Sequence, residues 1–496
     1  MAGYDVVVIG SGLGGLSAAV MLAKEGLRVL VVEQHRVVGG CLQSFRRGEY
    51  LLDTGIHYVG SLAEGRILNQ YFRYLGVMDR LQLQRLDDAG YDHIHLHDGT
   101  TYRHAAGYEN YVEELAVAFP HEREGLKAFC RQMKQVGDLI DPEVLRSGRL
   151  SAGGIEFMSL SVAEELERLI SDERLRQVLA GSVPLYAGQR NRSSFYEHAM
   201  INHSNIEGAY SFVGGTQQLA DLLADEIRRH GGEVRLSAEV TRIHLEGDRA
   251  EWLELNGEER IDTKWILSSI HPVRTFALLE NNTVIKRAFF SRLNALENSY
   301  GLFTVYLLLK RGSVPYENSN HYYYNAEDVW SHRADYRGVN LPVVLFSMQP
   351  SASGYSDVAT LLVPMLREDM ARWEASRVGR RGEEYEAFKA HFAERVIDFV
   401  AQYRPELKGQ IVAIHTASPL TYRDYTATPD GSAYGIVKDY HNPIVNHLPA
   451  RTRIQNLLLA GQNLNVHGAL GVVVSSAVSC SELLGVEYLA KKIGNA

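Results

Sequence analysis

The alternation of apolar and polar residues at the N-terminal end predicts a strand, a tight turn, a helix and a second strand. The β-branched run Tyr4–Ile9 is typical of a buried strand, and apolar residues then recur at helical spacing between Leu16 and Leu27. Gly26 is placed to end this helix, and Val29–Glu33 predicts the second buried strand. Together these segments predict one βαβ unit.

The hydrophobic pattern changes in the following part of the chain. Between Tyr71 and Asn205, long polar-amphipathic stretches dominate, for example Glu109–Ile140 and Ser161–Ala180. Apolar positions at helical spacing within a polar background are typical of surface helices. We therefore expect a mainly helical insertion here.

After this insertion the sequence again alternates strand-like and helix-like segments. A Gly-Gly turn within Phe212–Thr216 precedes a helix that Gly231 and Gly232 end. A long charged helix is expected near Glu383–Tyr403 and another from about Val472. Further strands are predicted at Val234–Leu236, Val240–Leu245, Trp265–Leu267, Thr304–Leu309, Val343–Met348 and Leu457–Ala460.

Length and composition narrow the class of protein. The chain has 496 residues, too many for one compact core, so two or more domains are expected. The net charge of −9 argues against a general nucleic-acid binder. Its three cysteines are far apart, which favours a reducing compartment without disulfides or a metal cage. No signal peptide or apolar run of transmembrane length is visible, so we expect a cytoplasmic protein.

A glycine-rich turn lies between the first predicted strand and its helix. The run from Gly10 to Gly15 satisfies the GxGxxG pattern, and the strand–turn–helix context is what dinucleotide binding requires. The glycines allow a tight turn and close approach of a pyrophosphate to the free N–H groups of the helix N-terminus. We expect the cofactor to contact Gly10, Gly12, Leu13, Gly14 and Gly15.

The residues after the second strand favour FAD as the dinucleotide. Glu33 follows Gly12 by about twenty residues, the spacing at which a carboxylate accepts hydrogen bonds from an adenosine ribose. Its charge would repel a 2′-phosphate, which disfavours NADP in this position. A second glycine turn, Gly39-Gly40, fits FAD better than NAD, and we expect Gln34, beside Glu33, to contact the cofactor too.

Glycines near the C-terminus predict the other end of the flavin site. The expected strand Leu457–Ala460 leads into Gly461-Gln462, and a second glycine group, Gly468–Gly471, opens the last predicted helix. A helix N-terminus here would stabilise the negative charge that a flavin ring gains on reduction. The cofactor contacts expected in these later segments are Val240, Gly461, Gln462, Gly471 and Val472.

Several of these runs resemble a known group of flavoenzymes, the carotenoid desaturase and isomerase superfamily, and retinol saturases in particular. The similarity is strong over about residues 4–60, 205–245 and 415–485. It is carried by Val31–His35, Gly39-Gly40-Cys41, Asp53–Gly60, Ser418–Thr421, Gly431–Gly435 and Leu459–Gln462. The resemblance implies FAD, an apolar isoprenoid or polyene substrate, and reduction or rearrangement of a conjugated double bond. It also implies NAD(P)H as an electron source, although no second nucleotide fingerprint is visible.

We therefore expect an α/β protein with a discontinuous, Rossmann-type FAD-binding domain of the glutathione-reductase kind. It comprises residues 1–70, 205–290 and 411–496, and residues 71–204 and 291–410 form an α+β substrate domain. Such enzymes gain by collecting a water-insoluble substrate from lipid without spanning it. We expect the substrate domain to open toward a membrane surface.

The expected chemistry is hydride transfer between the flavin and carbon, without a nucleophile or a metal. His57, Tyr58 and His467 are candidates for the proton donor or substrate anchor, with loop-fixing hydrogen bonds as their alternative role. The aromatic residues Tyr186 and His321–Tyr324 line an apolar channel or pack in the core. Three other functions stay open: a carotenoid cis–trans isomerase, a flavin amine oxidase, and a lipid-binding escort of the GDP-dissociation-inhibitor type.

Overall fold

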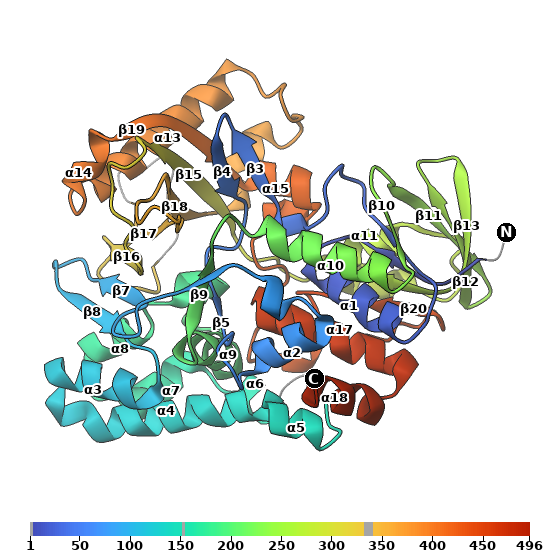
Figure 1. Ribbon diagram of the computed structural model, residues 1–496, viewed down its shortest axis with the longest axis horizontal. Helices are drawn as coiled ribbons and strands as arrows, with labels where there is room; N and C mark the ends of the chain where they lie inside the picture. The colour runs from blue at the N-terminus through green and yellow to red at the C-terminus, as the bar shows by residue number, and fades with distance from the viewer. Residues whose placement is uncertain (1–2, 151–153, 332–340) are drawn as a thin grey trace.

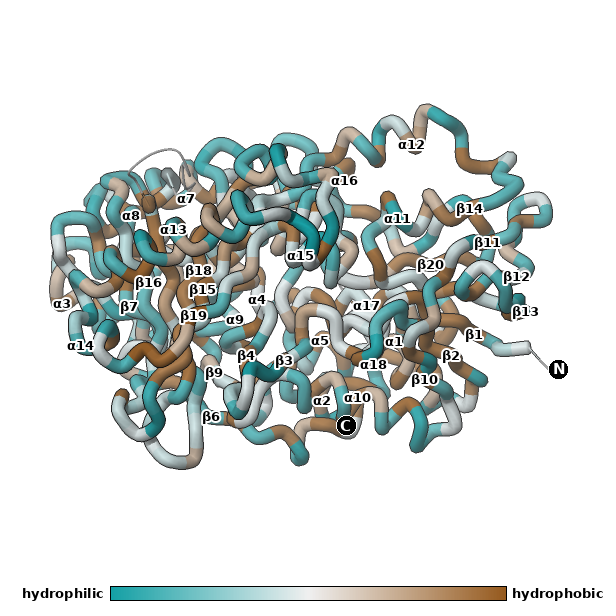
Figure 2. The backbone as a smooth tube through the Cα atoms, turned by 90° about the horizontal axis from the view of Figure 1, so that it is seen from above, coloured by the Kyte–Doolittle hydropathy of each residue, from teal (hydrophilic) through white to brown (hydrophobic). Residues whose placement is uncertain are grey.

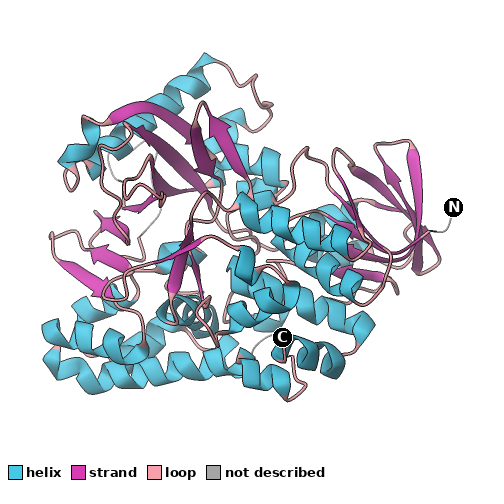
Figure 3. Ribbon diagram, in the orientation of Figure 1, coloured by secondary structure: helices cyan, strands magenta, loops and turns pink. Residues whose placement is uncertain are grey.

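Two mixed β-sheets with helices packed around them organise the chain in the computed structural model, which describes residues 3–150, 154–331 and 341–496. The sheet that contains the N-terminal strand lies at one end of the molecule, and the second sheet lies at the other (Figure 1). A layer of helices runs beneath both groups of strands (Figure 3). The expected α/β organisation is confirmed.

The predicted βαβ unit is confirmed and forms the centre of the first sheet. It consists of β1 (Tyr4–Ile9), α1 (Leu13–Lys24) and β2 (Val29–Val32), with β1 and β2 paired in parallel. All four residues of β2 are buried, as expected for a strand covered on both faces. The remaining parallel strands come from later segments: β10 (Glu233–Arg235), β13 (Glu259–Ser268) and β20 (Leu457–Leu459), giving the order β10-β2-β1-β13-β20.

Helices from three distant parts of the sequence cover this parallel sheet. α1 packs against α10 (Gln217–Arg229) and against α17 (Gly468–Leu484), which lies beside it in Figure 1. α17 begins four residues before the expected Val472. The glycines that predict a turn there lie within its first turn instead, where Gly471 packs tightly against the Val466 carbonyl group.

An antiparallel extension widens the first sheet. β11 (Val240–Glu246) and β12 (Arg249–Leu255) form a meander with β13, and the short β14 (Leu279–Glu280) pairs with β11. β12 was not predicted. Its sequence alternates buried positions with the polar residues Arg249, Glu251 and Glu254. Because of these polar residues, the half-buried strand was not recognised in the sequence.

The second sheet corrects one expected segment boundary and includes two strands from the helical insertion. These are β7 (Asp92–His95) and β8 (Thr101–His104), and most of the other described residues of the insertion are helical, as expected. β19 (Ile411–Ala417) pairs with β15, so residues 411–417 belong to this sheet rather than to the first. Its order is β19-β15-β18-β17-β16-β7-β8, with β15 (Gly301–Leu309), β16 (Asn320–Tyr324), β17 (Val343–Met348) and β18 (Val358–Met365).

Smaller elements complete the described structure. The small strands are β3 (Ser44–Arg47), β4 (Tyr50–Asp53), β5 (Val59–Gly60), β6 (Leu83–Arg85) and β9 (Ala209–Phe212). Helices of the insertion are α2 (Ile67–Leu75), α3 (Tyr108–Ala118), α4 (Arg123–Gly137), α5 (Pro142–Arg146), α6 (Ile155–Met158), α7 (Val162–Leu169), α8 (Glu173–Leu179) and α9 (Phe195–Ile206). The others are α11 (Pro272–Ala277), α12 (Arg287–Asn294), α13 (Glu383–Val400), α14 (Pro405–Lys408), α15 (Pro419–Thr426), α16 (Pro443–Asn446) and α18 (Val486–Gly494).

The apolar residues gather on the central strands. Hydrophobic stretches follow strands such as β16 and β20, whereas the outer loops are mostly hydrophilic (Figure 2). Among the described helices, none combines the length and the apolar character needed to cross a bilayer.

Candidate active site

One cavity of about 530 Å³ connects the two sheets. It begins at the carboxyl ends of β1 and β2, where ligands bind in open α/β sheets, and it reaches the inner face of the second sheet. The predicted site residues that line it are Gly10, Gly12, Leu13, Gly14, Glu33, Gln34, Gly39, Gly40, His57, Tyr58, Val240, Gly461, Gln462, His467, Gly471 and Val472. Gly15 is absent from this lining set and packs behind it.

The first glycine turn needs each of its glycines for a different reason. Gly10 adopts a φ of 92°, which disfavours any side chain. A Cβ atom on Gly15 would collide with the carbonyl oxygen of Gly10. Gly12 faces open space, with no heavy atom within 4 Å of an added Cβ, so its backbone is accessible from the cavity.

The second glycine turn lies directly against the first. Gly39 has a φ of 122°, and its N–H donates to the Ser11 carbonyl oxygen at 2.9 Å. A Cβ on Gly40 would approach the Cα of Gly12 to 3.3 Å. The two turns therefore form one wall that is built from backbone rather than from side chains.

Glu33 is fixed at the edge of this wall. Its Oε2 accepts hydrogen bonds from the N–H (3.0 Å) and hydroxyl (2.6 Å) of Ser11, and its Oε1 accepts from the His35 N–H at 2.9 Å. The side chain is 7% exposed and faces the cavity. Each carboxylate oxygen can accept further bonds, so the group is oriented for a polyol ligand.

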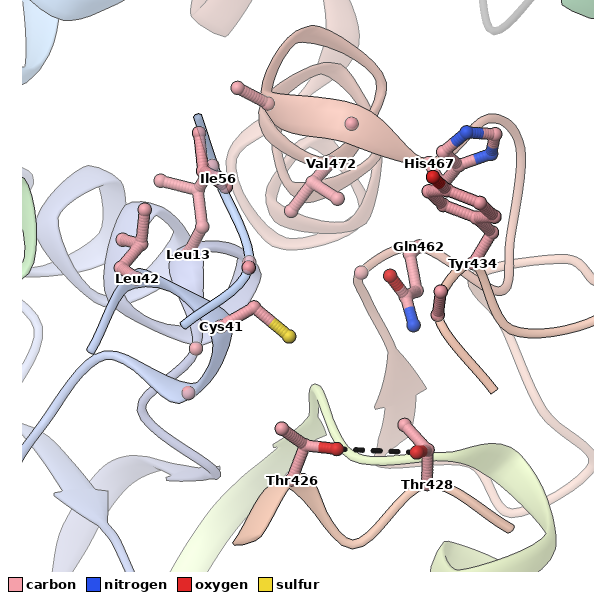
Figure 4. Close-up of a pocket in the computed structure, with 18 of the residues that line it drawn as sticks. Leu13, Cys41, Leu42, Ile56, Thr426, Thr428, Tyr434, Gln462, His467 and Val472 are labelled. Atoms are coloured by element: carbon pink, nitrogen blue, oxygen red, sulfur yellow. Dashed lines mark hydrogen bonds between the residues drawn. The ribbon is translucent and has the colours of Figure 1, made fainter. Parts of the chain in front are cut away.

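The C-terminal glycine segment closes the opposite side of the cavity entrance. An added Cβ on Gly14 would lie 3.0 Å from the Cα of Gly461, so the α1 turn and the segment after β20 touch. Figure 4 shows Leu13 and Val472 on neighbouring walls, with Cys41 and Gln462 directed into the space between them. Cys41 is unsuited to nucleophilic chemistry because burial raises the pKa of its thiol to about 11.

These residues fit a dinucleotide. The N-terminus of α1, capped by Gly12 without a side-chain hydrogen bond, presents free N–H groups and a positive dipole end to the cavity. The side-chain-free surface at Gly12 leaves room for a pyrophosphate, and Glu33 lies beside it for a ribose. Within the lining set, Gln462 and the start of α17 could hold the ring system.

The far end of the cavity is apolar. Its walls come from the second sheet, from α9 and from the segment before it: Leu185, Met200, Ile201, Leu302, Leu345, Phe346 and Leu362. These residues were not predicted as site residues because an apolar strand that lines a cavity has the same sequence pattern as one in the core. Of the aromatic residues His321–Tyr324, His321 and Tyr322 contribute to the cavity lining. Tyr186 instead hydrogen-bonds His198 in the core at 2.9 Å.

The two candidate histidines have different surroundings. Burial lowers the pKa of His57, whose backbone carbonyl accepts a hydrogen bond from Ser211 Oγ at 3.3 Å. His467 is more constrained: its Nε2 donates to the Leu185 carbonyl oxygen at 3.0 Å, its Nδ1 lies 3.6 Å from Glu197 Oε1, and Tyr434 packs against its ring (Figure 4). Burial lowers the pKa of His467 to about 4, so it is neutral at pH 7 and its N–H group is already engaged.

Tyr58 contacts Asp92, which sequence reasoning missed, and Tyr322, which it named only as a channel or core residue. Its hydroxyl donates to Asp92 Oδ2 at 2.9 Å and lies 2.7 Å from the hydroxyl of Tyr322. Asp92 was overlooked because it lies in the segment that was predicted to be helical. A regular alternation in Asp92–His95 was the signal for a strand.

The opposite face of the same strands carries three histidines. His93, His95 and His321 place ring nitrogens within 4.8 Å of one another, a spacing compatible with a metal ion. However, His95 Nε2 and His321 Nδ1 already share a hydrogen bond of 2.9 Å, and Arg404 Nη2 lies 2.9 Å from His321 Nε2. A nearby guanidinium disfavours a second cation, so the expectation of no metal stays a prediction.

Comparison with known proteins identifies the family. The family model for flavin-containing amine oxidoreductases matches residues 13–272, which include the end of the first glycine turn, Glu33 and the second glycine turn. The chain belongs to the flavin-containing amine oxidoreductase family. It is therefore an FAD-dependent oxidoreductase.

Relatives of this flavoenzyme cover nearly its whole length. The human all-trans-retinol 13,14-reductase is 29% identical over 97% of this chain and 85% of its own. A chloroplastic prolycopene isomerase from an Oncidium hybrid is 23% identical over 99% of this chain and 85% of its own. An oxidoreductase from Methanosarcina mazei has the same fold, with a TM-score of 0.63, 14% identity, and coverage of 95% of this chain and 98% of its own.

Proposed function

We propose that this flavoenzyme transfers hydrogen to or from a conjugated C=C bond of an apolar isoprenoid, such as a retinoid or a carotenoid-like polyene. The observation that carries the proposal is the single cavity that joins the glycine-rich wall to an apolar chamber. A chamber lined by aliphatic and aromatic side chains accommodates an extended hydrocarbon and excludes water from the reacting carbons. The names of the relatives point to the same substrate class.

The chain's own residues would bind FAD and position it. When bound, FAD supplies or accepts the hydride. The backbone at Gly10, Gly12 and Gly39-Gly40 would hold the pyrophosphate, and Glu33 would accept hydrogen bonds from the adenosine ribose. Gly461, Gln462 and the N-terminus of α17 would contact the ring system. Hydride transfer needs no nucleophile or metal.

We also propose that the two halves of the cavity correspond to two domains. Residues 1–70, 205–290 and most of 411–496 would form an FAD-binding domain of the glutathione-reductase kind. Residues 71–204 and 291–410, together with β19, would form the substrate domain. The pairing of β7 with β16 supports this division, because it joins the two substrate segments in one sheet.

The electron source and the membrane contact remain proposals. For reduction, NAD(P)H is proposed to reduce the flavin, and anaerobic bleaching of the flavin absorbance by NADPH or NADH tests it. We further propose that the substrate domain contacts a lipid surface during substrate loading. Flotation with neutral and with anionic liposomes tests this contact, and absence of binding to both would exclude it.

Anaerobic spectroscopy of the bound flavin tests the main proposal. The holoenzyme is photoreduced and then mixed with retinoids, carotenoids or amines. We expect a polyene to re-oxidise the flavin and to yield a product with one conjugated double bond fewer. Oxidation of amines with release of peroxide, and no reaction with polyenes, would overturn the proposal in favour of an amine oxidase.

Isomerisation is the second candidate, because one relative is named a prolycopene isomerase. It predicts a change in double-bond geometry of the polyene with no net flavin oxidation. Product analysis by chromatography in the same experiment distinguishes it from reduction.

A further inference from the structure

A carboxyl group is buried directly behind the apolar end of the cavity. Asp92 is 1% exposed, and its Oδ1 accepts a hydrogen bond from Asn320 Nδ2 at 3.0 Å. Its Oδ2 accepts from the Tyr58 hydroxyl at 2.9 Å and, more weakly, from the Tyr322 hydroxyl at 3.4 Å. Burying a carboxyl group beside an apolar chamber is costly, so its placement needs a reason beyond packing.

The strand register places the Asp92 carboxyl group behind the residues that line the apolar end of the cavity, and places its hydrogen-bond partners among those residues. β7 and β16 pair in parallel with Asp92 opposite Asn320, so Tyr322 lies two residues further along the same face. Tyr58 approaches from the segment between β4 and β5. Tyr58, Asn320 and Tyr322 line the cavity, whereas Asp92 does not. The two hydroxyls therefore separate the carboxyl group from the substrate space.

The surroundings of Asp92 raise its pKa, so much of it stays protonated at pH values where an exposed aspartate is fully ionised. Burial raises its pKa to about 7, although the hydrogen bonds from Asn320, Tyr58 and Tyr322 oppose this increase. In the part of the chain that the structure describes, no lysine, arginine or histidine forms an ion pair with Asp92. The other ionisable groups around it are Tyr91, Tyr111 and its cross-strand neighbour His104, whose pKa burial lowers to about 4.

We propose that Tyr58, Tyr322 and Asp92 form a proton-transfer unit for the reaction on the C=C bond, with Tyr58 as the group that touches the substrate. Asp92 is the proton source behind it, and Asn320 is a positioning residue that fixes the carboxyl group. This inference rests on the proposed function, because it supplies the proton that saturation of a double bond requires.

Saturation of the double bond needs a hydride and a proton. Bound FAD, when reduced, would supply the hydride to one alkene carbon and would become oxidised. The π-electron pair forms a new C–H bond at the adjacent carbon with the Tyr58 proton, and the Tyr58 O–H bond breaks. For this step Asp92 carries its proton on Oδ2 and donates to the Tyr58 oxygen, the reverse of the hydrogen bond that its carboxylate form accepts. The Asp92 O–H bond breaks in the same step and restores the Tyr58 hydroxyl, leaving Asp92 as a carboxylate that solvent re-protonates between turnovers. A free Tyr58 phenolate is avoided, as burial raises the pKa of Tyr58 well above its usual value.

The test compares three variants of the holoenzyme by stopped-flow re-oxidation of photoreduced flavin with the polyene that the wild-type enzyme accepts. Tyr58→Phe should slow re-oxidation by about 10²–10⁴-fold, the usual contribution of a positioned acid. Asp92→Asn should slow it by about ten-fold or more at pH 6. It should also abolish the decrease in rate that the wild-type enzyme shows as the pH rises through about 7. Tyr324→Phe is the matched control: it removes a buried hydroxyl from the same strand, bonded to the Gly181 carbonyl, and should leave the rate unchanged.

A stability measurement gives a readout that does not depend on turnover. The pKa of Asp92 is raised in the folded state, so the unfolded chain loses this proton at lower pH than the folded one, and stability falls as the pH rises from about 4 to about 7. The Asp92→Asn variant should not show this fall in stability, because asparagine does not ionise. Its melting temperature relative to wild type should therefore increase across that range.

Each failure has a different meaning. If no polyene re-oxidises the wild-type flavin, the proposed function is wrong, whatever the stability profile. If polyenes react but Tyr58→Phe reacts at the wild-type rate, the proton-transfer unit is wrong while the function stands. An Asp92→Asn variant with an unchanged pH–rate profile and a constant difference in melting temperature would likewise remove Asp92 from the unit.

Discussion

The cofactor end of the cavity is formed mainly by backbone, whereas the substrate end is formed by side chains. At the cofactor end, contacts come from backbone in tight glycine turns, and what matters is the absence of side chains at Gly12, Gly15 and Gly40. At the substrate end, side chains from the second sheet and α9 form the walls, such as Phe346 and Met200. Replacing a glycine in the backbone surface at the cofactor end would block that surface. Replacing one lining side chain at the substrate end would change only the local shape of the chamber.

The carboxyl groups at the two ends also differ. Glu33 accepts three hydrogen bonds from donors within 3.0 Å, which fix the orientation of its carboxylate. At the other end, Asp92 is buried, and burial raises its pKa to about 7. The carboxyl group where a ribose would bind is thus held by backbone and hydroxyl donors, whereas the one behind the apolar chamber stays partly protonated up to about neutral pH. Substitutions at the first end should alter flavin affinity, and those at the second should alter reactivity.

The largest effect is expected for Gly15→Ala. The added methyl group would collide with the Gly10 carbonyl oxygen, so the turn that presents α1 to the cofactor cannot form. We expect a protein without bound flavin, measured as the ratio of flavin to protein absorbance after gel filtration. Gly409→Ala is the matched control, because an added Cβ there meets no atom within 4 Å and its φ is −74°. Full flavin occupancy in Gly15→Ala would contradict a backbone-built cofactor end.

His57→Ala tests whether His57 belongs to the cofactor end or to the substrate end of the cavity. If His57 donates a proton or anchors substrate, the variant should retain FAD but re-oxidise with the polyene about 10²–10⁴-fold more slowly. Stopped-flow absorbance and flavin content are measured on the same sample. Loss of FAD would assign His57 to the cofactor end, and an unchanged rate would exclude it from the reaction.

Glu33→Ala should weaken FAD binding without changing the reaction once the site is filled. Removing charge-assisted hydrogen bonds of about 1.5–3 kcal/mol should lower the affinity by roughly ten- to a hundred-fold. Titration of the apoprotein with FAD, followed by flavin fluorescence, measures this change. Glu25→Ala is the control, because Glu25 is the C-cap residue of α1 and is absent from the cavity lining. An unchanged Kd would show that Glu33 supports the turn alone.

The smallest effect is expected at the apolar end, for Met200→Gln. This change nearly conserves volume but places an amide in the chamber, and should weaken polyene binding by about ten-fold, since burying an amide costs about 1–3 kcal/mol. Met133→Gln is the control: Met133 is buried in α4, away from the cavity, so it should lower stability without altering substrate affinity. Equal binding by both variants would mean that the substrate lies elsewhere.

The sequence predicted the cofactor end in detail because its signals are local. Gly10–Gly15, Glu33 and Gly39-Gly40 lie within one βαβ unit and its following turn, where spacing along the chain fixes distance in space. The predicted C-terminal glycines also line the same cavity. That they do so depends on α17 packing on α1, which local patterns alone do not specify.

The substrate end could be predicted only in part. Tyr58 was identified as a candidate, but its partners Asp92 and Tyr322 lie on strands that pair across more than two hundred residues of sequence. Because β7 and β8 contain many polar residues, these strands were not recognised within a segment that was predicted to be mainly helical. Likewise, β19 lies in the second sheet because pairing with β15 overrides its position near the C-terminal cofactor segment.

The sequence by itself determined the dinucleotide-binding unit, the flavin and the α/β class, because glycine conformations and hydrophobic periodicity act over a few residues. The tertiary structure alone decided which carboxyl group lies behind Tyr58, which apolar strands line a cavity rather than fill a core, and which face of β7 and β16 carries the three histidines. These outcomes depend on strand register. A shift of one residue exchanges the two faces of a strand, and register is set by packing across the whole sheet rather than by neighbours along the chain.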